Sequence, residues 1–314
     1  MAFSKRHVVS LLFGACAACG VCGGQGLSPR AYVITPIHWN AVTLTYEFQD
    51  GNIVFNDTVP IADARGSVNS ETVTLFHALN FLGRSANLNI SLPYSFGNFS
   101  GTVSGKRESI YRSGLAPAQF RLSINLKGGP AMTPADFSKW RQKTVIGASI
   151  TVVTPSGQYD PTRLVNIGAN RWAIKPEIGF SRRRGNWLLD AYAGVWFFTA
   201  NTDFFSSAPG SKGPNSQTQK PMGVVEMHLS YDVKPRFWFS IDGNYWYGGT
   251  TSLNGIVTPT TVQSNSRIGG TLSVPVTGRQ SIKFSYSTGT YVSFGGDYQT
   301  IQAAWQYSWI GRPN

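Results

Sequence analysis

The sequence predicts an all-β protein, a transmembrane antiparallel up-and-down β-barrel of 12 strands. Three observations indicate this fold. Apolar and polar residues alternate over many long segments, and long loops alternate with short turns between these segments. Charged residues make up only 13% of the chain, whereas about 25% is usual in soluble globular proteins. With 13% aromatic residues and 34 glycines, this composition suits an outer surface that faces an apolar medium.

The first residues have the pattern of a secretory signal peptide, which we assign to residues 1–26. Lys5 and Arg6 precede a mostly apolar run, and small residues follow. We expect cleavage after Gly24 or Gly26. A transmembrane anchor and a lipoprotein cysteine are the alternatives, but the apolar run is short and rich in glycine. The residues that precede each cysteine also fit a lipoprotein site poorly.

The rest of the chain, residues 27–314, is expected to be one outer-membrane barrel domain without cysteine. Cys16, Cys19 and Cys22 all lie in the signal peptide, so this exported domain must be stable without disulfides. Removing the two basic residues of the signal takes the net charge from +12 to +10. Nucleic acid is not expected as a partner of an exported chain. Anionic envelope components or anionic solutes fit the charge better, and charge alone does not choose between them.

The alternation has a period of two, which puts apolar and polar side chains on opposite faces of a strand. In residues 87–96, five apolar side chains fall on one face, and Asn, Ser and Pro fall on the other. Crossing a bilayer at a tilt takes about 9 to 11 residues, and most of the segments are that long. The twelve predicted strands are residues 41–49, 67–82, 86–97, 114–128, 142–155, 170–182, 186–200, 220–233, 236–249, 263–277, 279–291 and 297–309.

The connections predict the orientation of the barrel. Most connections after odd-numbered strands are long and rich in Gly, Asn and Ser, whereas the others are short turns such as "GRSA", "RRRGN" and "KPR". An even number of strands puts both termini on the short-turn side, the periplasm, with residues 27–40 as a short periplasmic segment. One turn, "GGPAMTPADFSKWRQ", is too long. Because Thr133 before Pro134 is a favourable helix start, we expect a short amphipathic helix there.

The polar faces of the strands predict the side chains that line the lumen. Residues on the two strands of a hairpin can be paired by counting from the turn. The predicted pairs are Glu177–Asp190, Lys175–Tyr192 and Arg171–Trp196 around "RRRG", His228–Asp242 and Glu226–Asn244 around "KPR", and Ser273–Lys283 around "TGR". The candidate lumen-lining residues are Arg121, Arg171, Lys175, Glu177, Asp190, Tyr192, Trp196, Phe198, Glu226, His228, Asp242, Asn244 and Lys283.

These lumen residues have two interpretations. They either fill the lumen and hold its shape, or they form a constriction that selects solutes by charge and hydrogen bonding. Trp196 and Phe198 are more apolar than a water-filled porin needs, which favours hydrophobic cargo or a packed lumen. Other aromatic residues fall on the apolar face, where two interfacial girdles are expected. These are Trp187, Phe237 and Trp309 near the short turns, and Phe197, Tyr245 and Tyr247 near the long loops.

Several stretches resemble one known family. They are "LSPRAYVITP", "NIGANRWAIKPEIGFS" before "WLLDAYAGVWFFTAN", "SNSRIGGTLSVPV" before "FSYSTG", and the final "AWQYSW". Together they look like the family named "putative MetA-pathway of phenol degradation", over residues 27–309. The resemblance implies a transport-type outer-membrane barrel connected with the uptake of aromatic or other hydrophobic compounds. It carries no catalytic signature, and no substrate-binding motif transfers residue by residue.

The function expected from the sequence is passive uptake of small molecules, including aromatic or hydrophobic ones, through an outer-membrane channel. The expected partners are outer-membrane lipid, the transported solute and the barrel-insertion machinery. No cofactor is expected, and the histidines lack the spacing of metal ligands. One alternative is a lipid hydrolase, which needs a Ser–His–Asp set reachable from lipid. Another is a structural or adhesive barrel that binds a partner through its long loops, for instance through residues 201–219.

Overall fold

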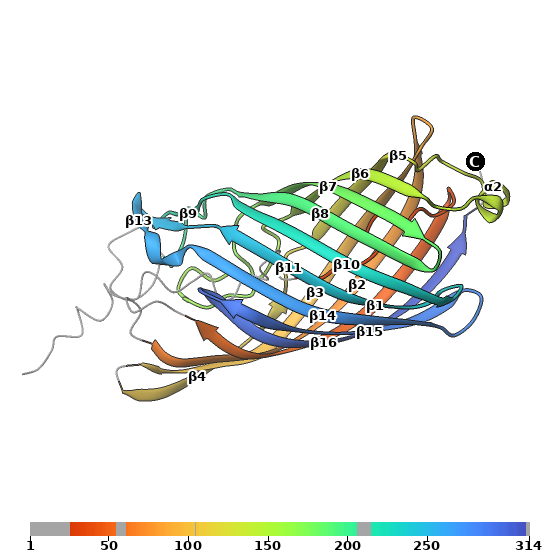
Figure 1. Cartoon of the computed structure of the whole chain (residues 1–314). Coiled ribbons are helices and arrows are strands. Elements are labelled where there is room, and N and C mark those ends of the chain that lie inside the picture. Colours follow the sequence, from red (N-terminus) through yellow and green to blue (C-terminus); the bar gives the residue numbers. More distant parts are fainter. Residues whose placement is uncertain (1–25, 55–60, 104, 206–214, 312–314) are drawn as a thin grey trace, which may run out of the picture.

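A computed structural model of the chain describes residues 26–54, 61–103, 105–205 and 215–311 (Figure 1). Residues 1–25 of the expected signal peptide lie outside the described part, so the predicted cleavage site stays a prediction. The described residues form one closed antiparallel sheet, a small sheet of three short strands and one short α-helix. None of the helices in this part of the chain is long and apolar enough to cross a membrane.

The strands of the closed sheet follow the predicted segments closely. They are β1 (Trp39–Val54), β2 (Ile61–Phe81), β3 (Arg84–Val103), β4 (Lys106–Leu115), β5 (Gln119–Lys127), β6 (Thr144–Val153), β7 (Ala173–Arg184), β8 (Trp187–Phe198), β10 (Met222–Lys234), β11 (Phe237–Gly248), β14 (Gln263–Pro275), β15 (Gln280–Val292) and β16 (Gly295–Ile310). The small sheet consists of β9 (Gln217–Gln219), β12 (Thr251–Leu253) and β13 (Ile256–Thr258), with a 3-10 turn, η2 (Pro259–Thr261), after it.

The thirteen strands of the large sheet make twelve wall positions, because β4 and β5 both pair with β3. A short break around Pro117, which has no backbone N–H to donate, separates these two strands. Each strand is antiparallel to the next, and β1 pairs with β16 from Trp39–Ile310 to Val54–Gly295. The barrel is therefore closed, and the predicted 12-strand up-and-down architecture is confirmed.

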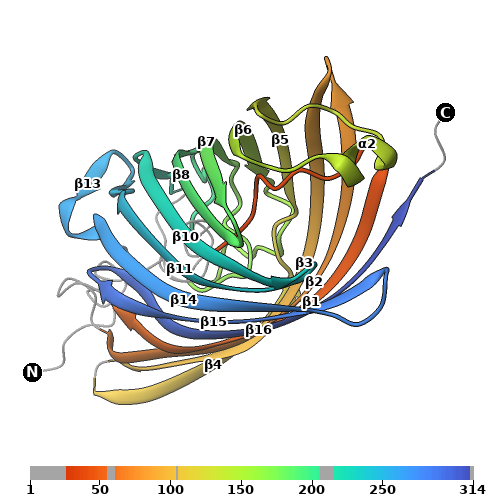
Figure 2. The same ribbon diagram turned by 45° about the vertical axis from the view of Figure 1, so that its right-hand side comes forward.

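The two ends of the barrel differ (Figure 1). One end carries the short turns, α2 (Pro134–Lys139) and the end of β16. The other carries the long loops, the small sheet and the projecting β3–β4 hairpin (Figure 2). We call these the short-turn end and the long-loop end. The predicted helix is confirmed as α2, since the Thr133 hydroxyl caps it by accepting from the Asp136 backbone N–H. Which end faces the periplasm stays a prediction.

Two of the expected long loops are mostly strand. β1 and β2 continue through much of residues 50–66, and β3 and β4 through much of residues 97–113. The expectation rested on the many Gly, Asn and Asp residues there, which have low strand propensity. In these extensions β1 pairs with β16 and with β2, and β3 pairs with β4. This interstrand pairing overrides the low strand propensity. The Arg65–Asp50 ion pair links β1 and β2 in this extension.

The outer face of the barrel is a band of exposed apolar side chains. Ile241 and Met227, in the middle of β11 and β10, are 61% and 60% exposed. Trp187 and Trp309 lie exposed near the short-turn end, and Tyr247 near the long-loop end. So much exposed apolar surface in a closed band fits contact with lipid hydrocarbon.

An arginine placed on this apolar band should destabilise the barrel, whereas an arginine on a surface outside the lipid should not. We expect Ile241→Arg to lower the free energy of unfolding in lipid vesicles by about 2–4 kcal/mol, because arginine at the bilayer midplane is destabilising. Ile256→Arg is the matched control, since Ile256 is 75% exposed in β13 beyond the barrel wall. Its expected change is within about 0.5 kcal/mol. Denaturant titration of both variants in vesicles measures this, and equal effects would contradict a lipid-facing band.

Candidate functional site

The described part of the N-terminal segment, residues 26–38, runs inside the barrel rather than outside it. Tyr32 and Ile34 are 0% and 1% exposed, and this segment borders the lumen cavity together with the inner faces of several strands. Near the short-turn end, the backbone N–H of His38 donates to the Ala78 carbonyl and that of Ile37 to the Met132 carbonyl. Trp39, which was expected in the same segment, already belongs to β1.

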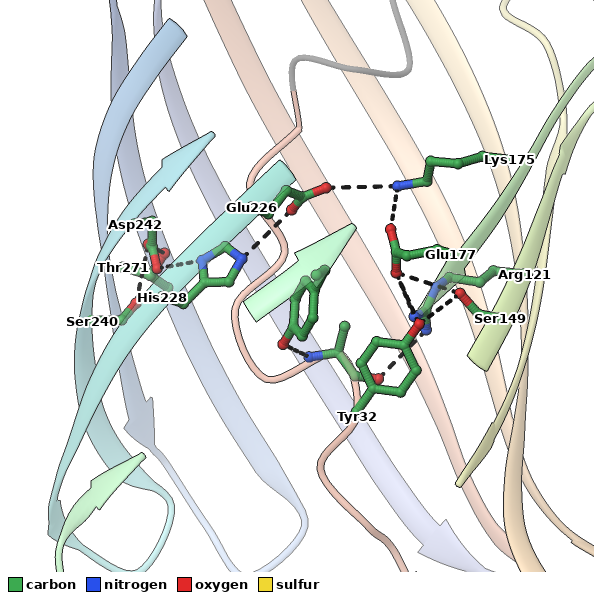
Figure 3. A network of polar contacts seen from close by, with 12 residues as sticks. Tyr32, Arg121, Ser149, Lys175, Glu177, Glu226, His228, Ser240, Asp242 and Thr271 are labelled. Carbon is green, nitrogen blue, oxygen red and sulfur yellow. Dashed lines mark hydrogen bonds and ion pairs between the residues drawn. The ribbon is translucent and has the colours of Figure 1, made fainter. Parts of the chain in front are cut away.

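Tyr32 is held in a slot made by two glycines. Gly147 of β6 and Gly179 of β7 are directly paired across the ladder, and a Cβ on either would overlap the Tyr32 ring. The Tyr32 hydroxyl lies 3.0 Å from the Ser149 hydroxyl and donates to the Glu177 carboxylate, also at 3.0 Å. Figure 3 shows the ring pointing toward these two strands. The glycines therefore let a large side chain lie directly on the wall.

Contacts on both sides of Tyr32 extend this attachment. The Arg30 guanidinium lies 2.7 Å from the Asp232 carboxylate and 4.1 Å from the centre of the Trp238 ring. Ile34 packs with Met132 and Val145 near α2. A cationic anchor at β10–β11 and an apolar anchor at α2 thus fix the segment across the lumen in its short-turn half.

A buried ion network lies beside the slot. The Lys175 ammonium is 2.6 Å from one Glu177 oxygen and 3.6 Å from Glu226. Arg121 contacts the other Glu177 oxygen at 3.4 Å, and its guanidinium lies over the Tyr32 ring. Glu177 therefore accepts from the wall and from the N-terminal segment at once, which couples the position of the segment to the charges of the wall (Figure 3).

His228 continues the network toward β11 and β14. Its Nδ1 lies 2.9 Å from Asp242 and its Nε2 lies 3.5 Å from Glu226. The hydroxyls of Ser240 and Thr271 both donate to the Asp242 carboxylate. Within the described chain, His228 bonds carboxylates and no hydroxyl, so the arrangement differs from a Ser–His–Asp relay, in which the histidine activates the serine.

The lumen aromatics are packed into an apolar cluster in the long-loop half. Trp196, Met222, Val224 and Trp246 are all at least 96% buried and contact one another. Phe198 packs against this cluster. Of the two expectations for Trp196 and Phe198, the structure shows the packed lumen, because these rings do not border the cavity. The cluster fills the side of the lumen that is formed by β7, β8, β10 and β11.

A large cavity of about 1670 Å³ lies beside this packed side of the lumen. It lies between the N-terminal segment and the inner faces of β1–β3 and β14–β16, and it reaches from Ile310 at the short-turn end of β16 to Gly296 at its long-loop end. On the inner faces of β1–β3 and β14–β16, most of the lining side chains are hydroxyls and amides, such as those of Thr45, Asn89 and Gln302. The lumen is thus divided into a packed half and an open half.

The predicted lumen residues fall into two groups. Arg121, Asp242 and Lys283 border the open cavity. The others belong to the packed half. Lys175, Glu177, Glu226 and His228 form the ion network. Asp190 lies opposite His228, and Asn244 lies opposite Glu226 and Arg267. The Tyr192 hydroxyl accepts from the Ala31 N–H. Trp196 and Phe198 pack in the apolar cluster, and Arg171 lies over the Phe198 ring.

The predicted strand registers are correct in two hairpins and wrong in the third. His228–Asp242, Glu226–Asn244 and Ser273–Lys283 pair as expected. Around "RRRG", Asp190 pairs with Ser181 instead of Glu177, and the expected Lys175–Tyr192 and Arg171–Trp196 pairs are likewise absent from the β7–β8 ladder. The turn lies at Gly185, whose φ of 59° suits the first position of a two-residue hairpin turn. The turn therefore lies further along the chain than the count assumed.

Sequence reasoning missed the residues that position the N-terminal segment, above all Tyr32 and Arg30. One signal was available. Gly147 and Gly179 fall on lumen-facing positions of adjacent strands, and glycine within a strand often marks the close approach of another group. Which group would approach was not visible, because the partner lies more than 100 residues away in the chain.

The fold defines the class of this protein: a β-barrel of the outer-membrane type, closed by twelve wall positions and apolar on its outside. Its family follows from a direct comparison. Residues 37–309 match the model of the family described as "Putative MetA-pathway of phenol degradation", and the chain belongs to that family. The resemblance found in the sequence is thereby confirmed.

One solved structure shows the same fold. An outer membrane channel from Pseudomonas putida F1 is 15% identical, with a TM-score of 0.72 over 90% of this chain and 100% of that one. The β domain of the Bordetella autotransporter BrkA is 9% identical, with a TM-score of 0.49 over 87% of this chain and 100% of that one. The NanC porin is 7% identical, with a TM-score of 0.45 over 85% of this chain and 98% of that one. No curated protein matches the chain.

The glycine slot predicts a specific interaction between Gly179 and Tyr32. We expect Gly179→Ala to lower the stability by about 1–3 kcal/mol, because the added methyl overlaps the Tyr32 ring in a packed site. In a Tyr32→Ala background, the same substitution should cost far less, since the ring is gone. Thermal unfolding of the two single variants and the double variant in detergent measures the coupling.

Gly243→Ala is the control for this cycle. An added Cβ there would meet nothing closer than 3.7 Å, so its effect should be small and independent of Tyr32. Additive effects of Gly179→Ala and Tyr32→Ala would show that the ring does not occupy the slot.

Proposed function

We propose that this protein is a passive outer-membrane channel for small molecules, aromatic compounds among them. The observation that carries the proposal is the open half of the lumen, a cavity bordered by residues at both ends of β16, from Gly296 to Ile310. Water and small solutes can follow such a polar path, and diffusion down a gradient requires no cofactor.

The lining of the cavity supports small molecules that combine a ring with a polar group. Hydroxyl and amide side chains dominate the inner faces of β1–β3 and β14–β16, and they offer both donors and acceptors. Aromatic side chains interrupt this lining at Trp39, Phe76, Phe99 and Trp238. The family to which the chain belongs is named for phenol degradation, and phenolic compounds have this mixed character.

The width available to a solute depends on the N-terminal segment, because the segment and the cavity share the cross-section of the lumen. Around Arg30–Tyr32 its contacts hold it against β6–β8 and β10–β11, and towards β1 the Thr35 hydroxyl donates to Asn87 on β3. The segment therefore acts as a fixed inner wall that narrows the path without filling it.

Reconstitution tests the proposal directly. In planar bilayers, the purified barrel should give steady ionic currents, and vesicles that contain it should take up phenolic solutes faster than protein-free vesicles. The absence of both current and accelerated uptake, with a barrel that is folded by gel mobility before and after heating, would rule out the channel function.

The inner wall predicts the effect of releasing its cationic anchor. We expect Arg30→Ala to increase the mean conductance and the current noise, because the segment loses its contacts with Asp232 and Trp238 and can leave its place. Arg65→Ala is the matched control: it also removes an arginine that pairs with an aspartate, but at the extended β1–β2 hairpin. Single-channel recording compares the two, and identical traces would contradict a fixed inner wall.

A further inference from the structure

We infer that the open half of the lumen selects for small organic anions, carboxylates above all. The inference rests on the proposed channel function and names its substrate class. Seven Lys or Arg side chains border the cavity, whereas only Glu47, Asp232 and Asp242 supply carboxylates to it. An excess of positive charge on low-dielectric walls concentrates anions in the path and repels cations.

Two of the three carboxylates contribute less negative charge to the path than their number indicates, because basic side chains of the protein already bind them. Asp232 is shared by Arg30 and Arg183. Asp242 accepts from His228 and from two hydroxyls. Glu47 accepts from the side-chain amides of Gln49 and Gln302, which are neutral, so Glu47 remains a negative charge in the lining.

The cations are distributed so that one of them remains available within the path. Lys283 on β15 is partly exposed to the cavity, and no hydrogen bond or ion pair holds its ammonium in the part of the chain that the structure describes. Its neighbours on the lumen face are small: Ser281 and Ser285 on the same strand, and Ser273 and Ala304 across the ladders. The side chain therefore has room to meet a solute.

The short-turn mouth adds a second group of cations. Arg141, Arg183, Lys234 and Arg236 border the cavity there. The Arg236 guanidinium donates hydrogen bonds to backbone carbonyls of the neighbouring turn at 277–280. These carbonyls are neutral, so the positive charge of Arg236 remains. Together with Lys283 further inside, these residues make a cationic route from the mouth into the lumen. An anion leaving the lumen on this side meets more positive than negative charge, because Asp232 is the one carboxylate that lines the cavity among these cations.

A carboxylate attached to a small ring or a hydroxylated body matches this route. Its charged end would meet Lys283 and the mouth cations, and its body would meet the hydroxyls, amides and occasional rings of the lining. A neutral phenolic solute would gain only the second set of contacts, and an amine of the same size would be repelled.

The reversal potential under a salt gradient tests the inference. In planar bilayers with a KCl gradient at low ionic strength, where screening is weakest, we expect the sign for anion preference. A gradient of potassium benzoate should give the same sign. Lys283→Gln should reduce the ratio of anion to cation permeability several-fold, and Lys283→Glu should reduce it further. Gel mobility before and after heating confirms that both variants are folded.

Lys106→Gln is the matched control, because Lys106 is exposed on β4 and does not border the cavity. It removes the same charge and should leave the reversal potential unchanged. A conducting channel with cation preference, or one whose selectivity is indifferent to Lys283, would overturn the inference and leave the channel function standing. The absence of any current would remove the channel function itself, and the inference with it.

Discussion

The structure depends on one ladder, the pairing of β1 with β16. In lipid, every backbone N–H and C=O must find a partner within the protein, and an open sheet leaves two rows unpaired. The β1–β16 ladder runs over the whole of both strands, so neither edge is left open. Once the sheet is closed, the period of two divides every strand into a lipid face and a lumen face. The low charge of the sequence and its polar interior are both consequences of this closure.

The positions of small and large side chains determine which part of the lumen is packed and which is open. Gly147 and Gly179 let the Tyr32 ring lie against the wall, so the N-terminal segment lies against β6 and β7 at this point. Large residues such as Trp196 and Trp246 fill the same side. On the opposite side, Ser, Thr, Asn and Gln leave the cavity open. The division into a packed half and an open half is thus a matter of side-chain volume, and the ion network around Glu177 lies at the boundary between the halves.

The sequence was informative wherever structure depends on local periodicity. Alternation alone assigned the strand faces, and turns as short as "KPR" set the His228–Asp242 register. The register predicted around "RRRG" was wrong. The turn forms at Gly185, whose φ is positive, and the arginines before it still belong to strand β7. Strand propensity gave the wrong prediction in the extended β1–β2 and β3–β4 hairpins. There, pairing with neighbouring strands outweighs the low strand propensity of Gly and Asn. The location of the N-terminal segment could not be predicted, because it depends on contacts between Tyr32 and strands far along the chain.

The position of Tyr32 also constrains the order of assembly. Its slot is built by β6 and β7, in the middle of the chain, whereas the ladder that closes the barrel joins β1 to β16. The segment immediately precedes β1, so it is drawn toward the interior as β1 takes its place in the wall. If it were left outside when the last ladder formed, it would have to thread through one end of a finished barrel. The native contacts of Tyr32 therefore require the segment either to be inside before the β1–β16 ladder closes or to enter afterwards through one end of the barrel.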